Sequence, residues 1–467
     1  AVFVTRALPA AIRKRLQFED IRIVQMFGED SAQDAQKTVA AARQQGADWT
    51  VVDGYHFTNQ WQHAVRDAGL RLLVFDDHGQ IGCHCAEIVV DPNLGATADR
   101  YAGCPEKTRR LLGPRYVHLR REFRRWQEWR RECPPVGRHI LVTLGGSDPG
   151  NAAVKIIQAL DRIRRPQFEA VVLVGPANPH RAELEAAVRQ SRAMIDLRES
   201  VQDVAEWMAW ADLVIAAGGT TCWELAFLGV PSLLAILADN QAGVARAADT
   251  AGFARCLGRA EDLRDTVLAK AIESLLADVS ARQRMAERGR QAVDGDGVER
   301  VLMHLRNQPL RLRRARAADL ELLWRWANDP DVRRASLSVR PISWDEHVRW
   351  FEQKQREPGC SMYLGRDTDD EPVGQVRVDR TESGDAEIHV SVASNHRGTG
   401  WGERLIRLAV ERLSREHGLH QVRAVIKDDN VRSLRAFEKA GFCQVGSETR
   451  QGVRVVHAVF PCGESIR

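Results

Sequence analysis

The sequence predicts an α/β protein in which two lobes built on parallel sheets are followed by a smaller domain of mixed α and β structure. From residue 1 to about residue 300, short runs rich in β-branched residues alternate with amphipathic helical stretches, a pattern typical of parallel α/β architecture. An arginine-rich bridge near 120–135 separates two such series, and the composition changes again near 307–310.

The strand-like runs of the first series are AVFVTR, IRIVQM, WTVVDGY, RLLVFDD and EIVVDPN, and those of the second are HILVTLGG, FEAVVLVGP, MIDLRES, LVIAAGG and PSLLAIL. Two Rossmann-like lobes that face each other would bind a substrate in the cleft between them. We therefore expect one lobe over 1–135, a second over 136–306 and a last domain over 307–467.

Composition and charge exclude several classes of protein. Of the 467 residues 44% are apolar and 28% charged, and no apolar run approaches the roughly 20 residues of a membrane-spanning helix. The net charge is only +4, and the arginines of RREFRRWQEWRRE alternate with acids as on a solvated helix face. We expect neither a nucleic-acid partner nor a membrane.

The nine cysteines are scattered, and their odd number argues against a disulfide framework. This usage predicts a reducing, cytoplasmic location. Cys83, His84 and Cys85 are adjacent, but no second Cys/His pair follows at ligand spacing, so we expect free thiols and no metal.

Residues 385–413 predict a strand, a glycine-rich loop and a helix whose apolar positions fall on one face. The loop residues Arg397, Gly398, Thr399, Gly400, Trp401 and Gly402 stand at the start of that helix. Backbone N–H groups at a helix N-terminus favour an anion, and glycines permit a close approach of the backbone. The loop therefore predicts a site for a pyrophosphate, although a plain tight turn explains such a loop equally well when it stands alone.

A second segment decides between these interpretations. The run VRAVIKDDNVRSLRAFEKAGF predicts a strand and then a helix with Asn430, Ser433 and Phe437. Loop and helix together strongly resemble the GNAT acetyltransferases over about 310–460. The resemblance implies acetyl-CoA as co-substrate, with its pyrophosphate on the loop, its pantetheine arm along the strand at Val390 and Val392, and Asn430, Ser433 and Phe437 near the cofactor.

Acetyl transfer of this kind needs a base for the ammonium proton and an acid for the thiolate. Glu387, on the strand before the loop, matches the position of a glutamate in some GNAT enzymes and is the best candidate for the base; a solvated strand residue explains it equally well. His389 is a weaker candidate. Phe437 occupies the place of a tyrosine that is the acid in many relatives, so the acid stays unassigned.

The sequence at the start of this domain indicates which subgroup of the GNAT acetyltransferases it resembles. The runs LRLRRARAADLELLWRWANDPDVRRASLS, WDEHVRWF and PVGQVRVDR look like the acetyltransferases of pseudaminic acid biosynthesis. Those enzymes modify the 4-amino group of a UDP-linked dideoxy aminosugar. Most of the tryptophans are explained as core aromatics, but the string WANDPDVR as a whole is not.

In the second lobe, glycine-rich turns follow two strands, and polar residues end a third. The residues at these strand ends are Gly145, Gly146, Ser147, Asp148, Gly218, Gly219, Thr220, Thr221, Asn240 and Gln241. The turns lead into helices that offer N–H groups to a phosphate, and Glu224, one turn into its helix, could accept the ribose hydroxyls. The set predicts a site for a nucleoside diphosphate.

The strings GGSDPGN, AAGGTTCWELAFLGVPSL, VVDGYHF and LLGPRYVHLRREF resemble the UDP-sugar hydrolases of the same pathway, which have a GT-B fold. The resemblance covers about 1–300 and implies hydrolysis of the UDP-sugar that the acetyltransferase would produce. Tyr55 matches a family tyrosine near the scissile bond.

Relatives begin with a further strand and a Gly-His loop, whose histidine is held to act on the attacking water, and AVFVTR looks like their second strand. We therefore expect a truncated module that hydrolyses poorly, and we interpret His56, His78 and His84 as ordinary surface or structural histidines. Two alternatives stay open: a GT-B glycosyltransferase fused to a GNAT domain, and a non-catalytic module that binds UDP-sugar beside an active GNAT domain.

Overall fold

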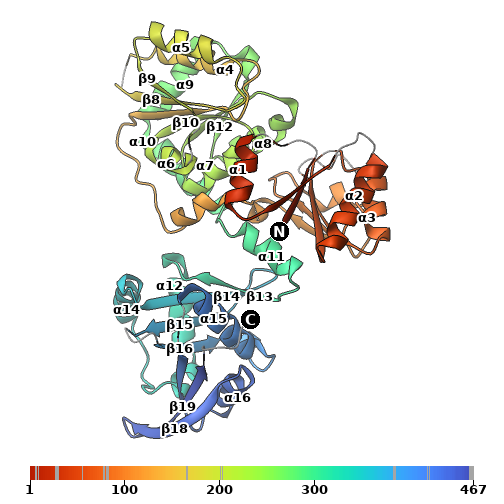
Figure 1. The fold of residues 1–467 in the computed structure, drawn as a ribbon. Coiled ribbons are helices and arrows are strands. Elements are labelled where there is room, and N and C mark those ends of the chain that lie inside the picture. Colours follow the sequence, from red (N-terminus) through yellow and green to blue (C-terminus); the bar gives the residue numbers. More distant parts are fainter. Residues whose placement is uncertain are drawn as a thin grey trace. The chain divides into compact units, whose positions relative to one another are not determined.

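The structure is a computed structural model, and it describes all residues except 6, 7, 9, 27–30, 55, 77, 78, 80–83, 165, 166, 200, 202, 382–384, 418, 420 and 462–467. The chain divides into two compact units, 1–301 and 302–467. Strands and helices alternate through the first unit, and the second has a mixed sheet with helices on both faces (Figure 1). The predicted α/β class is confirmed.

The second lobe of unit 1 is a six-stranded parallel sheet in the order β12-β11-β10-β7-β8-β9. Its strands are β7 (His139–Thr143), β8 (Glu169–Val174), β9 (Met194–Glu199), β10 (Leu213–Ala217), β11 (Ser232–Ile236) and β12 (Arg255–Arg259). β10 and β11 consist almost entirely of alanine and larger aliphatic residues that are buried on both faces, as in a sheet covered by helices on each side. The strand order reverses between β7 and β10, as in a doubly wound fold.

The helices of this lobe are α4 (Ala152–Leu160), α5 (Arg181–Gln190), α6 (Val204–Trp210), α7 (Thr221–Leu228), α8 (Ala242–Ala251), α9 (Asp265–Ala277) and α10 (Val279–Ala292), and α11 (Gly297–Leu305) follows them. Two hydrophobic clusters cover the two faces of the sheet. One includes Trp223 and Phe227 from α7, and the other includes Ile156 from α4 and Ile272 from α9.

The described residues of the first lobe form two parallel sheets. β1 (Val2–Thr5) pairs with β2 (Arg22–Gln25), while β3 (Trp49–Asp53), β4 (Arg71–Phe75), β5 (Ile88–Asp91) and β6 (Arg109–Leu112) form the other sheet. Its helices are α1 (Ala10–Phe18), α2 (Ser31–Gln44) and α3 (Asn59–Asp67). β1 and β3 are edge strands among the described residues, and Phe3 and Val51 on them are 41% and 52% exposed.

The first part of the arginine-rich bridge forms a 3-10 helix (Arg121–Trp126). Its arginines pair with acids of several segments: Arg125 lies 2.5 Å from Asp203 and 2.9 Å from Glu206. These ion pairs compensate part of the positive charge of the bridge.

Unit 2 has a seven-stranded sheet in the order β13-β14-β15-β16-β17-β19-β18, antiparallel except between β16 and β17. The strands are β13 (Leu310–Arg314), β14 (Cys360–Asp367), β15 (Pro372–Arg380), β16 (Asp385–Val392), β17 (Gln421–Lys427), β18 (Cys443–Arg450) and β19 (Val453–Pro461). The helices are α12 (Leu320–Ala327), α13 (Pro330–Ala335), α14 (Trp344–Arg356), α15 (Trp401–His417) and α16 (Val431–Lys439).

The alternation of side chains along β14 shows which helices cover which face. Tyr363 lies in the cluster with α15 and α16, whereas the next residue, Leu364, lies in the cluster with α12 and α14. The predicted apolar face of α15 is buried against the sheet: its residues Leu405, Ile406, Ala409, Val410 and Leu413 are at most 2% exposed.

Candidate functional site

In unit 1 the predicted nucleotide-binding loops follow β7 and β10, which pair in parallel. The chain order of the strands reverses between these two, so both loops lie at the switch point where open α/β sheets bind ligands. Gly145, Gly146 and Ser147 are exposed there, and Gly145 has a φ of 86°, which favours glycine.

Asp148 has a structural role that the sequence did not reveal. Its Oδ1 accepts the N–H of Ala152 (2.9 Å) and its Oδ2 the N–H of Ala153 (3.0 Å), and its side chain is buried. The expectation that the N-terminus of α4 offers these N–H groups to a phosphate is therefore wrong, because a carboxylate of the chain already accepts them. The exposed amides of 145–147 are the groups that a phosphate could reach.

The loop after β10 lies against the segment after β11. A Cβ on Gly218 would meet the Gln241 carbonyl oxygen at 3.2 Å and the Ala245 Cβ at 2.9 Å, so glycine permits this close approach. The Gln241 side chain in turn accepts the N–H of Leu237 (2.9 Å). The structure thus brings Gly218, Gly219 and Gln241 together, with Thr220 and Asn240 exposed beside them and Thr221 at the start of α7.

Glu224 on α7 is buried and forms a two-pronged ion pair. Arg120 donates from Nε to Oε1 (2.6 Å) and from its Nη2 to Oε2 (2.9 Å). Burial raises the pKa of the Glu224 carboxyl above its ordinary value, and Arg120 opposes that shift. Sequence reasoning missed Arg120, which lies 104 residues away along the chain.

Tyr55 and His78 lie outside the described residues. His84 is fully buried, with Nε2 2.7 Å from the Asp76 Oδ2 and Nδ1 3.1 Å from the Gln62 Nε2. This is the structural role that we expected for His84. His56 stacks beside Phe57 with ring centroids 4.0 Å apart.

In unit 2 the parallel ladder between β16 and β17 is short. It pairs Asp385 with Gln421 and ends at Glu387 with Arg423. Beyond that point β16 still pairs with β15 as far as Val392, and β17 pairs with β19 as far as Lys427. The two strands therefore diverge, and the backbone of β16 at Val390 and Val392 faces the opening.

The glycine-rich loop follows at the end of β16. Gly398 and Gly400 have φ values of 81° and 86°, and a Cβ on either would meet no atom within 4 Å. Thr399 donates its hydroxyl to the His396 carbonyl (2.8 Å), and α15 begins at Trp401. Gly402 lies near Val392, whose Cγ2 would be 3.6 Å from an added Cβ. This exposed loop at the start of a 17-residue helix has the geometry of an anion site.

The Arg397 side chain is bound to other residues of the chain. It contacts Asp329 (2.8 Å) and Asp331 (2.9 Å), and its Nε donates to the Val392 carbonyl (3.1 Å). Asp329 also caps α13 by accepting the N–H groups of Asp331 and Val332. Arg397 thus connects the loop to the segment that carries the string WANDPDVR.

That string has a structural explanation that the sequence alone did not show. Asn328 accepts the Ile342 N–H at Oδ1 (2.7 Å) and donates to the carbonyls of Ile342 (3.0 Å) and Trp324 (3.2 Å). The Trp324 indole donates to the same Ile342 carbonyl (2.8 Å). The motif therefore holds the segment between α13 and α14 in place.

The predicted residues of α16 also have local partners. The Asn430 Oδ1 accepts the Ser433 N–H (3.2 Å) and caps the helix. Phe437 is buried, with its ring centroid 4.9 Å from that of Phe442. Phe437 lines a hollow of about 420 Å³ together with Ile426, Leu434, Glu438, Gly441, Phe442, Cys443, Gln444 and Ala458.

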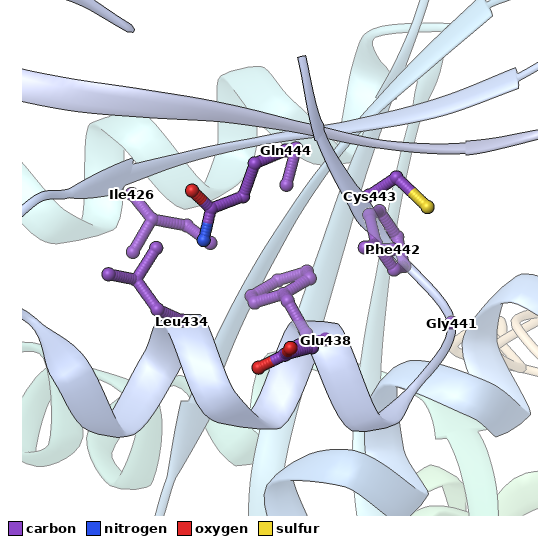
Figure 2. Close-up of a pocket in the computed structure, with 9 residues that line it drawn as sticks. Ile426, Leu434, Glu438, Gly441, Phe442, Cys443 and Gln444 are labelled. Atoms are coloured by element: carbon purple, nitrogen blue, oxygen red, sulfur yellow. The ribbon is translucent and has the colours of Figure 1, made fainter. Parts of the chain in front are cut away.

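In this hollow the side chains of Ile426 and Leu434 point toward one another, and the Gln444 amide reaches in from β18 (Figure 2). Of the residues predicted to bind acetyl-CoA, Phe437 alone belongs to its lining. We therefore locate the candidate acetyl-CoA site at the opening between β16 and β17 and not in this hollow.

Glu387 and His389 project from β16 where the strands diverge. Their side chains are 39% and 40% exposed, and the His389 Nε2 lies 3.3 Å from the Glu387 Oε1 and 3.4 Å from the Asp379 Oδ2. Either group could accept a proton from an amine in the opening.

With this geometry in place, comparison with known proteins identifies both modules. Residues 309–443 match the family described as acetyltransferase (GNAT) domain, and residues 139–301 match the glycosyltransferase family 28 C-terminal domain. Spore coat polysaccharide biosynthesis protein SpsG of Bacillus subtilis is 30% identical over 235 residues, which cover 50% of this chain and 68% of SpsG. The chain belongs to the glycosyltransferase family 28-like proteins, as a homologue of SpsG with a GNAT domain.

Other relatives extend the similarity of the family 28-like module and of the whole chain. The UDP-N-acetylglucosamine–N-acetylmuramyl-(pentapeptide) pyrophosphoryl-undecaprenol N-acetylglucosamine transferase of Halorhodospira halophila is 30% identical over 282 residues, 56% of this chain and 73% of that protein. An uncharacterized protein of Methanocaldococcus jannaschii is 24% identical over 415 residues, 85% of this chain and 81% of the relative.

The GNAT domain is also similar to the crystal structure of spermidine N-acetyltransferase from Vibrio cholerae in complex with CoA and spermine. The TM-score is 0.31 at 19% identity, over 33% of this chain and 96% of that one. In the part of the chain that the structure describes, no group of three His, Cys, Asp or Glu side chains could hold a metal ion. None of the described helices is long and apolar enough to cross a membrane.

Proposed function

We propose that the chain is a bifunctional sugar-nucleotide enzyme of pseudaminic acid biosynthesis. Its GNAT domain transfers an acetyl group from acetyl-CoA to the 4-amino group of a UDP-linked dideoxy aminosugar. Its family 28-like module then hydrolyses the resulting UDP-diacetamido sugar to UDP and free sugar. The two reactions are consecutive, because the product of the first is the substrate of the second.

The divergence of β16 and β17 is the observation that carries the acetyltransferase proposal. It exposes the edge of β16 up to Val392, directly before the loop with Gly398 and Gly400. The amides of 398–402 would bind the pyrophosphate of acetyl-CoA, and the β16 backbone would bind its pantetheine arm. Bound there, acetyl-CoA would supply a thioester carbonyl for attack by an amine, and Glu387 or His389 would accept the ammonium proton.

The proposal for the nucleotide rests on the loops at the switch point between β7 and β10. The amides of 145–147 and 218–219 would bind a diphosphate, and Glu224 would accept ribose hydroxyls while Arg120 keeps it ionised. We propose that Tyr55 lines the sugar side of this site. The names of SpsG, a polysaccharide biosynthesis protein, and of the N-acetylglucosamine transferase support a UDP-sugar as the ligand.

The test is an assay with acetyl-CoA and UDP-4-amino-4,6-dideoxy-N-acetyl-altrosamine that measures free CoA and free UDP in the same tube. Release of both supports both activities, and CoA without UDP supports the acetyltransferase alone. Release of neither contradicts the proposal.

The transferase relative favours a second candidate, a glycosyltransferase. UDP release that requires an added sugar acceptor would support it over hydrolysis. UDP binding without any release would instead support a non-catalytic binding module.

A further inference from the structure

A cluster of charged side chains lies on the face of β15 and β16 that α14 covers. We call it the β15–β16 polar cluster; its members are Lys354, Arg377, Asp379, Glu387 and His389. In the antiparallel register Asp379 is opposite Glu387, and Arg377 is opposite His389. Since these positions are two residues apart on each strand, their side chains share one face.

Asp379 is the centre of the cluster. Its Oδ1 accepts from the Lys354 Nζ (3.0 Å) and its Oδ2 from the Arg377 Nε (2.8 Å), and the His389 Nε2 lies 3.4 Å from the same Oδ2. Although burial acts to raise it, contacts with His389, Arg377 and Lys354 hold the pKa of the Asp379 carboxyl well below its ordinary range. Asp379 is therefore an anion whenever the enzyme works near neutral pH.

The two carboxylates determine which nitrogen of His389 carries the proton. Asp379 and Glu387 both approach Nε2, at 3.4 and 3.3 Å, and an ionised carboxylate only accepts hydrogen bonds. The neutral ring therefore keeps its hydrogen on Nε2 and its basic lone pair on Nδ1. Neither carboxylate needs to take up a proton for this arrangement to act.

The position of His389 on β16 matches this assignment. The ladder between β16 and β17 ends at Glu387, two residues earlier, so His389 lies beyond the last pair, where the strands diverge. Its side chain is 40% exposed. Glu387, by contrast, is at the last paired position.

We propose that His389 is the proton acceptor of the acetyl transfer and that Asp379 and Glu387 position its ring. In this step the amine nitrogen attacks the thioester carbonyl carbon and the N–C bond forms. The Nδ1 of His389 takes the ammonium proton, and the C–S bond breaks to release the CoA thiolate. The inference rests on the proposed acetyltransferase function and assigns a role that Glu387 would otherwise fill.

Charged and titratable groups from each neighbouring element bear on the pH dependence. They are Lys354 of α14, Cys360 of β14, Arg377 and Asp379 of β15, and Glu387 of β16. Burial raises the pKa of the Cys360 thiol to about 12, so this thiol does not titrate near neutral pH. Asp379, which is ionised, and the Cys360 thiol, which is protonated, therefore do not contribute an acid limb to the rate profile near neutral pH.

The experiment compares the full-length chain with H389Q, E387Q and D379N, and measures kcat and KM for acetyl-CoA and for the aminosugar between pH 5 and 9. The control is H139Q on β7, because the His139 side chain is similarly exposed, at 41%, and lies beside a carboxylate, 3.4 Å from the Asp212 Oδ2, but belongs to the other compact unit. For H389Q we expect kcat to fall about 100-fold or more, the lower end of the range for a lost general base, and the acid limb to disappear. KM for acetyl-CoA should not change.

In E387Q, kcat should fall about tenfold or less and the rate profile should keep its acid limb, since a Gln carbonyl can still accept a hydrogen bond from the His389 Nε2. D379N should shift the acid limb to lower pH, because the imidazolium loses an anionic neighbour. Free imidazole should restore part of the rate of H389A, which a variant that fails to fold could not show. A loss in E387Q equal to or greater than that in H389Q overturns the assignment, whereas a wild-type chain that acetylates no amine contradicts the proposed function itself.

Discussion

At the scale of single residues, the ion pair with Arg120 determines whether the carboxyl of Glu224, which we predict to bind the ribose, is charged. The Glu224 side chain is 12% exposed, so its carboxylate needs a charged partner in order to stay ionised. Arg120 provides that partner, and its guanidinium also lies over the Phe123 ring at 5.4 Å. Arg120 is therefore a positioning residue for whatever Glu224 binds.

We predict that R120M destabilises unit 1 and makes its stability more dependent on pH. Removing one partner of a buried pair costs about 3–5 kcal/mol, and because the Arg120 side chain is 39% exposed we expect about 2 kcal/mol. A carboxyl whose pKa is raised on folding destabilises the folded state as pH rises through that value. In urea unfolding, the loss of unfolding free energy in R120M relative to the wild type should thus be larger at pH 8 than at pH 5.

The neighbouring R121M is the matched control, since Arg121 pairs with Glu19 at a side-chain exposure of 73%. Its unfolding free energy should stay within about 0.5 kcal/mol of the wild type. A pH-independent deficit in R120M would mean that Glu224 keeps its charge without Arg120.

Residue types and spacing located the site residues, but not their partners. Asp148 was predictable as a loop residue after a strand, while its acceptance of two N–H groups of α4 depends on its left-handed backbone, with a φ of 42°. Arg397 was predictable as part of an anion loop, yet its carboxylate partners come from a segment 66 residues away. A single sequence contains no signal for contacts of that range.

At the scale of elements, the spacing of apolar residues predicted strands and helices well where the same face or faces are buried along the whole element. The strands β7, β10 and β11 are runs of apolar residues because both faces are covered, and the apolar face of α15 appeared at helical spacing because a single face is covered. The end of the β16–β17 ladder was not predictable, because the pattern of both strands continues beyond it. The same holds for the division of the first lobe into two sheets.

We predict that the loop between β16 and α15 needs glycine for two separable reasons. Gly400 has a φ of 86°, so G400A should lose about 1 kcal/mol of stability from backbone strain. If the amides of the loop also bind pyrophosphate, the variant should in addition raise KM for acetyl-CoA about tenfold. Gly452, in the turn between β18 and β19, has a φ of 78° and equally open surroundings.

G452A should therefore introduce the same backbone strain as G400A without changing the loop between β16 and α15. We expect the same loss of stability in thermal unfolding and no change in KM. Equal KM values for G400A and the wild type would exclude the loop as the pyrophosphate site.

At the scale of the whole molecule, the two units have separate hydrophobic cores. The clusters around α7 and α4 belong to unit 1, and those around α15 and α14 belong to unit 2. Each unit also has its own glycine-containing loops at strand ends, after β7 and β10 in one unit and after β16 in the other. The two proposed reactions need both sites to be active, but they do not need the sites to influence each other.

We therefore predict that substitutions in the two sites act additively. E224Q should weaken UDP binding and leave KM for acetyl-CoA unchanged, and G400A should do the reverse. If the two sites share no partners, the double variant should match the sum of the single effects within about 0.5 kcal/mol. Calorimetric titration with UDP and steady-state kinetics with acetyl-CoA measure the two effects separately. A coupling above that value would show that nucleotide binding changes the acetyltransferase site.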